Sequence, residues 1–219
     1  MKPSMIAVLL AAMPFAAAAQ DAVTVDPAHY RVLVDNAVVR VLKVSYGVGE
    51  KSVMHAHPDA MLVPFASSTA RFTLPDGRTQ DLDVKAETVA YTPATTHLPA
   101  NLGPGKIDAL LVEFKGKEGG GRMPTARPGM TQTVLAESPR ATAWRTTATP
   151  AFHEAAGTTH DYDQVVIALG ASDVKVAVEG QPARTHWERG DVLFIGRGVN
   201  HESQNTSGKP VDFVIIGVK

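Results

Sequence analysis

Cysteine, net charge and long apolar runs are all scarce in this chain of 219 residues. Because there is no cysteine, no disulfide can stiffen the fold and no thiolate can serve as a nucleophile or metal ligand. Any metal must be held by His, carboxylate or amide groups. Lys plus Arg number 21 against 22 for Asp plus Glu, so there is no broad basic field for nucleic acid or anionic lipid. We expect a small molecule as the partner, and no nucleic acid.

The apolar run at the N-terminus is short. Lys2 precedes an apolar stretch from Met5 to Ala19, which ends in small residues before Gln20. A charged start, a short apolar core and an Ala-x-Ala site are typical of a signal peptide, here residues 1–19. A retained anchor is the alternative, but this core is shorter than a spanning helix requires. We therefore expect a periplasmic or secreted protein with no membrane contact in its mature form.

Helical periodicity is scarce after the signal peptide, because apolar residues do not recur at three-to-four spacing over 12 or more positions. Short apolar or alternating runs between Gly, Pro, Asn and Asp are abundant instead, and they predict an all-β fold. These runs are Val38–Tyr46, Met61–Phe65, Ala109–Phe114, Gln164–Leu169, Val174–Val178, Val192–Ile195 and Val211–Val218.

The chain divides at a segment rich in Gly, Pro and charge, which begins at Gly116 (GKEGGGRMPTARPG). Such a composition disfavours the interiors of strands and helices. We predict a linker at 116–136 between an N-terminal domain, 22–115, and a C-terminal domain, 137–219.

The two domains repeat one pattern. Chemically similar residues recur at an offset of 103, which becomes 104 after one inserted residue: His57/His160, Gly77/Gly180, Val89/Val192 and Tyr91/Phe194, then His97/His201, Asn101/Asn205 and Asp108/Asp212. Two copies are too few for a solenoid, so each should close on itself as a small barrel or sandwich. The pattern predicts an internal duplication.

Histidines form the main chemical signal of the first copy. His55 and His57 are two residues apart, which places both side chains on one face of a strand. His97 follows a predicted strand and turn. Three converging imidazoles would provide three nitrogen donors with open coordination positions, the arrangement that catalytic metals use. Partly buried strand histidines that only make hydrogen bonds are the alternative.

Both copies resemble the cupin superfamily. Residues 190–205 (GDVLFIGRGVNHESQN) keep the spacing of the second cupin motif, with Gly196 in place of its proline, and the first copy keeps Pro93, His97 and Asn101. The resemblance implies a bicupin, that is, two tandem double-stranded β-helix (jelly-roll) barrels with a metal or ligand pocket in each. Residues 55–59 (HAHPD) also resemble small single-domain cupins named for β-alanine degradation.

Carrying over the cupin ligands gives His55, His57 and His97 for one divalent transition metal ion, Fe, Mn, Ni or Zn. Met61 stands at the usual glutamate position, so the resemblance is to the three-histidine variant of the site. Asp59 lies near enough in sequence to be considered as a fourth ligand, although Pro58 perturbs the strand.

The second copy has Thr158 in place of the first histidine and keeps His160, Gln164 and His201 as a second pocket. Two imidazoles and a neutral amide make a weak metal site. This pocket could bind an organic ligand instead, or be a degenerate copy kept for its packing; the broken histidine pair favours the degenerate copy.

These features favour a metal-dependent enzyme acting on a small molecule, with a dioxygenase-type reaction first and an isomerase, lyase or decarboxylase next. With Met61 in the glutamate position, no obvious general base is present. A non-catalytic exported binding protein and a structural module with a vestigial site are the alternatives. Sheet edges that need covering favour a homodimer, although no motif specifies one.

Overall fold

The computed structural model describes residues 20–116 and 127–219. The predicted signal peptide, 1–19, lies outside the described residues, as do residues 117–126 of the predicted linker. Strands dominate the described part, where the helix α1 (Ala22–Val25) is a single turn capped by the side chain of Asp21. No helix among these residues has the length and apolarity needed to cross a membrane. The all-β prediction is confirmed.

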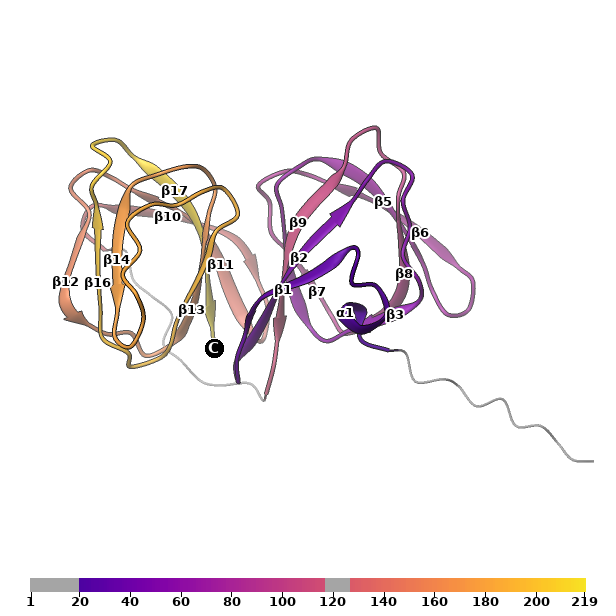
Figure 1. Cartoon of the computed structure of the whole chain (residues 1–219), viewed down its shortest axis with the longest axis horizontal. Coiled ribbons are helices and arrows are strands. Elements are labelled where there is room, and N and C mark those ends of the chain that lie inside the picture. Colours follow the sequence, from indigo (N-terminus) through magenta and orange to yellow (C-terminus); the bar gives the residue numbers. More distant parts are fainter. Residues whose placement is uncertain (1–19, 117–126) are drawn as a thin grey trace, which may run out of the picture.

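The N-terminal barrel consists of a five-stranded and a four-stranded sheet that face each other (Figure 1). In spatial order the larger sheet contains β1 (Tyr30–Asp35), β2 (Val39–Tyr46), β9 (Ile107–Phe114), β4 (Ala60–Pro64) and β7 (Ala90–Thr92). The smaller sheet contains β3 (His55–His57), β8 (Thr95–Asn101), β5 (Ser68–Thr73) and β6 (Thr79–Val84). The turn between β5 and β6 uses Gly77, whose φ of 82° is readily adopted only by glycine.

The C-terminal barrel repeats this arrangement. Its larger sheet contains β10 (Met130–Glu137), β11 (Ala141–Ala148), β17 (Val211–Val218), β13 (Asp163–Ala168) and β15 (Val192–Ile195). Its smaller sheet contains β12 (His153–Thr158), β16 (His201–Asn205) and β14 (Val174–Val178). The strand order is the same, and the pairs β1–β2 and β10–β11 each carry one register shift. The chain therefore has two tandem jelly-roll barrels related by duplication, as predicted.

Strand β10 corrects the predicted linker. Met130–Glu137 pairs along its length with β11, although the composition of the preceding stretch predicts a linker as far as residue 136. The sequence MTQTVLAE is strand-like from Gln132 onwards, but the Gly-rich and Pro-rich residues before it hide where the strand begins. The C-terminal barrel therefore begins at or before residue 130.

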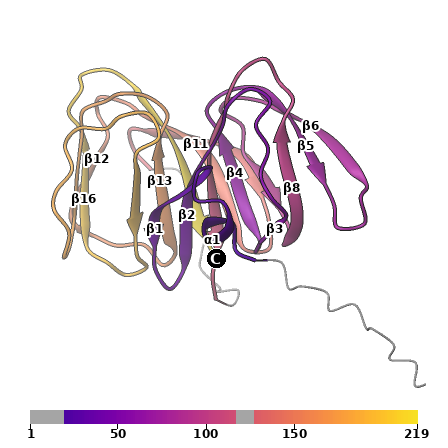
Figure 2. The same ribbon diagram turned by 45° about the vertical axis from the view of Figure 1, so that its right-hand side comes forward.

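The two barrels share an apolar core between their five-stranded sheets. One buried cluster combines residues of β2, β4 and β9 with residues of β11, β13 and β17: Val39, Val41, Met61, Val63, Leu110, Val112, Ala141, Ala143, Val165, Ile167, Val214 and Ile216. Strands β9 and β17 are buried on both faces, which explains their nearly continuous apolar sequences. Figures 1 and 2 show the two barrels packed side by side through these sheets.

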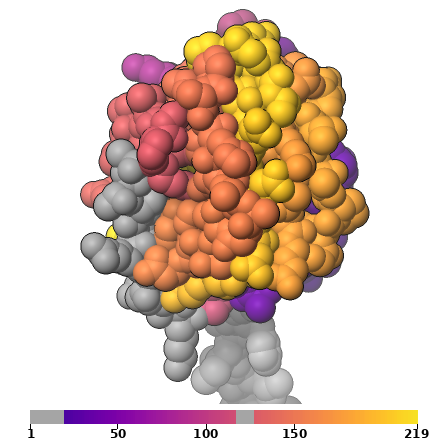
Figure 3. Space-filling model, turned by 90° about the vertical axis from the view of Figure 1, so that its left-hand side faces the viewer, coloured from indigo at the N-terminus to yellow at the C-terminus, as the bar shows by residue number. Residues whose placement is uncertain are grey.

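The two barrels differ on the sides that face away from each other. Figure 2 shows the β5–β6 hairpin projecting from the N-terminal barrel on the side away from its neighbour. The opposite end, seen in Figure 3, is formed mainly by residues coloured orange to yellow, which belong to the C-terminal barrel. The described part of that barrel has no strand equivalent to β6, since its smaller sheet ends at β14. The extra strand of the N-terminal barrel enlarges the wall around its interior.

Candidate metal centre

Strand pairing brings the three predicted histidines of the first copy together. Strands β3 and β8 are antiparallel, and His55 lies directly opposite His97. His57 is two residues further along β3, and the burial pattern of that strand alternates so that both histidines point into the barrel. At most 6% of each of the three residues is exposed. The nitrogen donors of the three rings lie within 4.8 Å of one another.

The hydrogen bonds of His55 and His57 decide which ring nitrogens face each other. His55 Nδ1 lies 2.8 Å from the Val53 carbonyl oxygen, and His57 Nδ1 lies 2.6 Å from Glu113 Oε1. A carbonyl oxygen and a carboxylate oxygen only accept hydrogen bonds, so each neutral ring carries its proton on Nδ1. The two Nε2 atoms, 3.0 Å apart, therefore meet with their lone pairs. Such lone pairs repel each other, and a shared cation would satisfy both.

His97, the third histidine, also has a ring nitrogen that a cation could bind. His97 Nδ1 is buried and has no hydrogen-bond partner, which is uncommon for a buried polar atom. Burial, and then the neighbouring His57 and His55, lower the pKa of His97 to about 3. Burial, followed by the influence of His57, also lowers the pKa of His55. Both imidazoles are therefore neutral near pH 7, the form in which histidine binds metals. The three side chains fit a divalent metal ion.

A buried carboxylate orients His57 from behind. Glu113 of β9 is 1% exposed, and its two oxygens serve different partners. Oε1 accepts from His57 Nδ1, and Oε2 accepts from Arg40 Nε at 2.5 Å. Arg40 also donates to Asp21, the residue that caps α1. A carboxylate behind a ligating histidine fixes its tautomer and raises its basicity.

The sequence contained one signal for Glu113, a single acidic residue inside the apolar run Ala109–Phe114. Its role could not be read from spacing, because β9 joins the site only through pairing with β2 and β4. Glu113 lies opposite Arg40 on one side and opposite Ala60 on the other. The small side chain of Ala60 leaves room for the carboxylate.

The assignment of Met61 to the glutamate position of the site was wrong. Met61 is fully buried in the core between the barrels, and its neighbour Leu62 faces the cavity. In β4, Met61 lies opposite Val112 of β9, whereas in β13 Gln164 lies opposite Gly217 of β17. The two copies are therefore out of step by one residue here, and a shift of one residue moves a side chain to the other face of a sheet.

Asp59 is not part of the histidine group. Its Oδ1 accepts from the backbone N–H of Ala94 at 3.0 Å, and its Oδ2 accepts from the Tyr91 hydroxyl at 3.2 Å. These bonds tie the start of β4 to the turn between β7 and β8. Pro58 separates Asp59 from His57 and ends the alternation that would have carried it into the site. Its role is to hold the turn that precedes His97.

A cavity of about 330 Å³ opens next to the histidines. His57 and His97 form part of its wall, Tyr30 and Phe72 pack against them, and the inner face of the β5–β6 hairpin forms much of the remainder. The Tyr30 hydroxyl is itself bonded to that of Tyr46 at 2.9 Å. Among the described residues that line this cavity there is no Lys, Arg, Asp or Glu. Its interior is therefore mainly apolar and carries no formal charge.

The second pocket contains a residue that the sequence did not mark. His160 and His201 come together with Glu154 of β12, whose carboxylate lies within reach of both imidazoles. Gln164 lines the same small cavity as Glu154 and His201. Thr158 lies opposite His201, as His55 lies opposite His97 in the first barrel, so the broken histidine pair is confirmed. Glu154 had no motif to mark it, since a bend in the chain brings it beside His160.

Comparison with known proteins defines the fold. No protein-family profile and no curated protein sequence matches the chain. The oxalate decarboxylase of Lactobacillus farciminis, solved as a formate complex, is 12% identical over 87% of this chain and 84% of its own, with a TM-score of 0.59. A mutant of Bacillus subtilis oxalate decarboxylase is 12% identical over 87% of this chain and 75% of its own, also with a TM-score of 0.59. A cupin 2 conserved barrel domain protein from Leptotrichia buccalis is 10% identical over 87% of this chain and 88% of its own, with a TM-score of 0.55.

These similarities cover both barrels, and at 10–12% identity they describe the fold alone. Together with the repeated sheet order, they show that the chain has the two-barrel cupin fold. The resemblance of its first copy to cupins named for β-alanine degradation stays a prediction.

Proposed function

We propose that the protein is an exported, metal-dependent enzyme in which His55, His57 and His97 hold one divalent transition metal ion. The observation that carries this proposal is the approach of two Nε2 lone pairs to 3.0 Å, with the buried third imidazole beside them. Three nitrogen ligands leave coordination positions open for a substrate. When bound, such a metal ion supplies Lewis acidity or a site for oxygen activation.

The protein's own residues position the ligands and exclude water. Glu113 keeps the proton of His57 on Nδ1, so that its Nε2 is available as a ligand. The ring of Tyr30 packs edge-on against His55 and at a tilt against His57, at ring-centroid distances of 5.0 and 5.3 Å. This packing restricts the rotation of both imidazoles and covers them with apolar surface. Phe72 lies 4.2 Å from the ring of His97. A substrate in the cavity would therefore meet a rigid, largely dry centre.

The cavity supports a neutral and mainly apolar substrate. At about 330 Å³ it is roughly twice the size of a cavity that accommodates benzene, about 150 Å³. Oxalate, which two structural neighbours are named for, is a small dianion. Here the bound metal ion would be the only cation to meet it, because no Lys or Arg lies among the described residues that line the cavity. Such a lining favours a larger and mainly apolar compound over oxalate.

The same lining supports an oxygenase-type reaction over one that depends on proton transfer. Both oxygens of Glu113 are engaged with His57 and Arg40, behind the histidine and away from the cavity. The described residues that line the cavity include no carboxylate and no lysine. A general base within reach of a bound substrate is what proton abstraction would require. A reaction centred on the metal and a co-substrate does not need one.

The first test measures the metal content of untagged protein by elemental analysis. The second measures oxygen uptake by the Fe(II)-loaded and Mn(II)-loaded protein in the presence of a panel of small neutral aromatic and aliphatic compounds. Oxalate serves as the anionic control. We expect about one equivalent of metal in the N-terminal barrel, its loss in His57→Ala, and oxygen uptake with a neutral compound only. Metal content that His57→Ala leaves unchanged would overturn the site, and metal binding without turnover on any compound would favour the non-catalytic binding protein.

A further inference from the structure

The C-terminal barrel contains a second group of metal-type ligands that its cupin motif did not predict. His160 Nε2 lies 3.5 Å from Glu154 Oε1, and His201 Nε2 lies 3.6 Å from Glu154 Oε2. Ligands bound at about 2.0–2.2 Å to a tetrahedral ion are separated by about 3.3–3.6 Å. Two imidazoles and one carboxylate are a common ligand set for divalent transition metals. The spacing of this group is that of a cation site.

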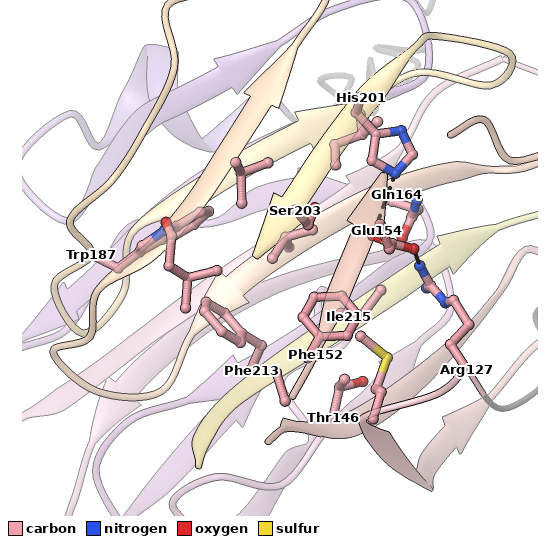
Figure 4. A pocket seen from close by; sticks show the side chains of 16 residues that line it. Arg127, Thr146, Phe152, Glu154, Gln164, Trp187, His201, Ser203, Phe213 and Ile215 are labelled. Atoms are coloured by element: carbon pink, nitrogen blue, oxygen red, sulfur yellow. Dashed lines mark hydrogen bonds and ion pairs between the residues drawn. The ribbon is translucent and has the colours of Figure 1, made fainter. Parts of the chain in front are cut away.

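His201 is oriented as a ligand would be. Its Nδ1 lies 3.2 Å from the Val199 carbonyl oxygen, which only accepts, so the ring proton is on Nδ1. Its Nε2 is buried without a hydrogen-bond partner, and the residue is 3% exposed. Figure 4 shows this nitrogen directed at Glu154, with Arg127 on the other side of the carboxylate. An unpaired buried lone pair aimed at a carboxylate needs a cation or a proton between them.

A guanidinium group already contacts part of this group, although it leaves His201 Nε2 without a partner. Arg127 NH1 donates to Glu154 Oε1 and lies 3.1 Å from His160 Nε2. These are two of the three atoms that would bind a metal ion. The guanidinium and a metal ion on this group therefore cannot be present together, because they use the same lone pairs.

Arg127 fits this position incompletely. Its Nε and NH2 are buried and have no hydrogen-bond partner, although each unsatisfied buried donor costs free energy. Gln164 Nε2, also buried and unpartnered, can only donate and so does not complete the guanidinium's bonds. Among the described residues, Glu154 is the only carboxylate paired with Arg127, and Gly217, opposite Gln164, takes the place that Glu113 has in the first barrel. A Cβ on Gly217 would meet the ring of Trp144 at 3.0 Å, so a larger residue there would require the neighbouring rings to shift.

The adjoining cavity is too small for an organic ligand. Its volume is about 40 Å³, enough for a few water molecules, and its far wall is closed by Trp187 and Phe213 (Figure 4). The expectation that this pocket could bind an organic molecule is therefore not supported, whereas an ion would fit.

We propose that Glu154, His160 and His201 form a second cation-binding site, in which a divalent metal ion and the Arg127 guanidinium compete for one position. With Arg127 in place the site resists metal ions, and when the guanidinium leaves, its three ligands are free to bind one. The two barrels then differ in a defined way: the first site is open to metal, and the second is closed by an internal cation.

The experiment measures metal binding in the full chain after the first site has been disabled by His97→Ala. In this background, isothermal titration with Zn²⁺ gives the affinity, and the visible absorption of Co²⁺ reports the ligand geometry. Arg127→Leu removes the charge and the donors, while Arg127→Lys is the matched control that keeps a positive charge. Adding His201→Ala to Arg127→Leu removes one ligand. Circular dichroism verifies that each variant is folded.

We expect Arg127→Leu to bind one equivalent of Zn²⁺ at least tenfold more tightly than the His97→Ala background. The Zn²⁺ affinity of Arg127→Lys should stay close to that of the His97→Ala background, and adding His201→Ala to Arg127→Leu should abolish the increase in affinity. Equal affinities with Leu and with Arg at position 127, or a gain that survives His201→Ala, would overturn the proposal. Because the first site is disabled throughout, a failure here is independent of whether the N-terminal barrel binds metal. If Arg127→Leu does not fold, displacement of Arg127 is tested in the His97→Ala protein, where Zn²⁺ must shift the ¹⁵N resonance of the Arg127 guanidinium.

Discussion

Glu113→Gln tests how the first site is held together. The amide oxygen of glutamine can still accept from His57 Nδ1, but its NH2 group would then face Arg40 Nε, which is also a donor. The substitution therefore removes the negative charge behind His57 and replaces one charge-assisted hydrogen bond by a contact between two donors. The shape of the buried side chain is almost unchanged, so the effect isolates charge and donor character.

The magnitude follows from burial. Both Glu113 oxygens lie in a site where the side chain is 1% exposed, and Arg40 is 19% exposed. Removing one partner of a buried ion pair costs about 3–5 kcal/mol. Arg40 keeps its bond to Asp21, so we expect the free energy of unfolding of the metal-free protein to fall by about 2–3 kcal/mol. The metal affinity should fall by about 10- to 100-fold, the usual effect of losing a carboxylate behind a ligating histidine.

The assays are denaturant unfolding of the metal-free protein and calorimetric titration with Mn²⁺ or Zn²⁺. Asp81→Asn is the matched control, because Asp81 forms an ion pair with Arg71 in which both side chains are more than 40% exposed. Exposed pairs contribute about 0–1 kcal/mol, and this one is remote from the histidines. A metal affinity of Glu113→Gln within twofold of the natural protein, with unfolding affected as expected, would refute the role assigned to the carboxylate.

Three further outcomes are expected. Trp187→Ala should lower the free energy of unfolding by about 3–5 kcal/mol in denaturant titrations, because Trp187 is fully buried in the C-terminal barrel and its removal leaves a cavity. Hydrogen bonds from His186 to Asp173 and Glu188 raise the pKa of this exposed histidine. These contacts therefore stabilise the fold below pH 6.5, and the stabilisation is lost as the pH rises through the higher pKa of the folded state. An NMR titration should show that Asp173→Asn brings the pKa of His186 back towards 6.5. Removing the metal with a chelator should lower the thermal midpoint of the natural protein. The loss of stability should be about 2.7 kcal/mol when the free metal concentration had been 100 times the Kd. The thermal midpoint of His97→Ala should not change.

Local patterns in the sequence predicted the elements and the first ligand set. The alternation of His55 and His57 along a strand, and the register kept between His97 and His201, are one-dimensional signals that survive without knowledge of the fold. Strand alternation predicted the strands, and the motif repeated at a nearly constant offset predicted the duplication. The convergence of His97 with His55 and His57 followed from the resemblance to the cupin motifs.

Register errors mark where the sequence was insufficient. Met61 and Gln164 align at an offset of 103, but strand pairing shows the copies to be displaced by one residue at this point. A side chain points into or out of a barrel according to its position in the strand. The shift of one residue therefore places Met61 in the core between the barrels and Leu62 in the cavity wall. The composition of the linker likewise concealed β10, because pairing with β11 stabilises a strand that its own sequence only weakly favours.

The all-β class and the duplication were readable from the sequence, because they follow from strand alternation and from repeated motifs. The three histidines of the first barrel were readable through the resemblance to the cupin motifs. The position of Glu113 behind His57, the contribution of Glu154 and Arg127 to the second group, and the contrast between a roomy apolar cavity and a nearly filled one emerged from the fold alone. Each of these contacts joins residues from strands or loops that are distant in the chain. Their meeting depends on sheet order and register, and these arise from the packing of the whole molecule.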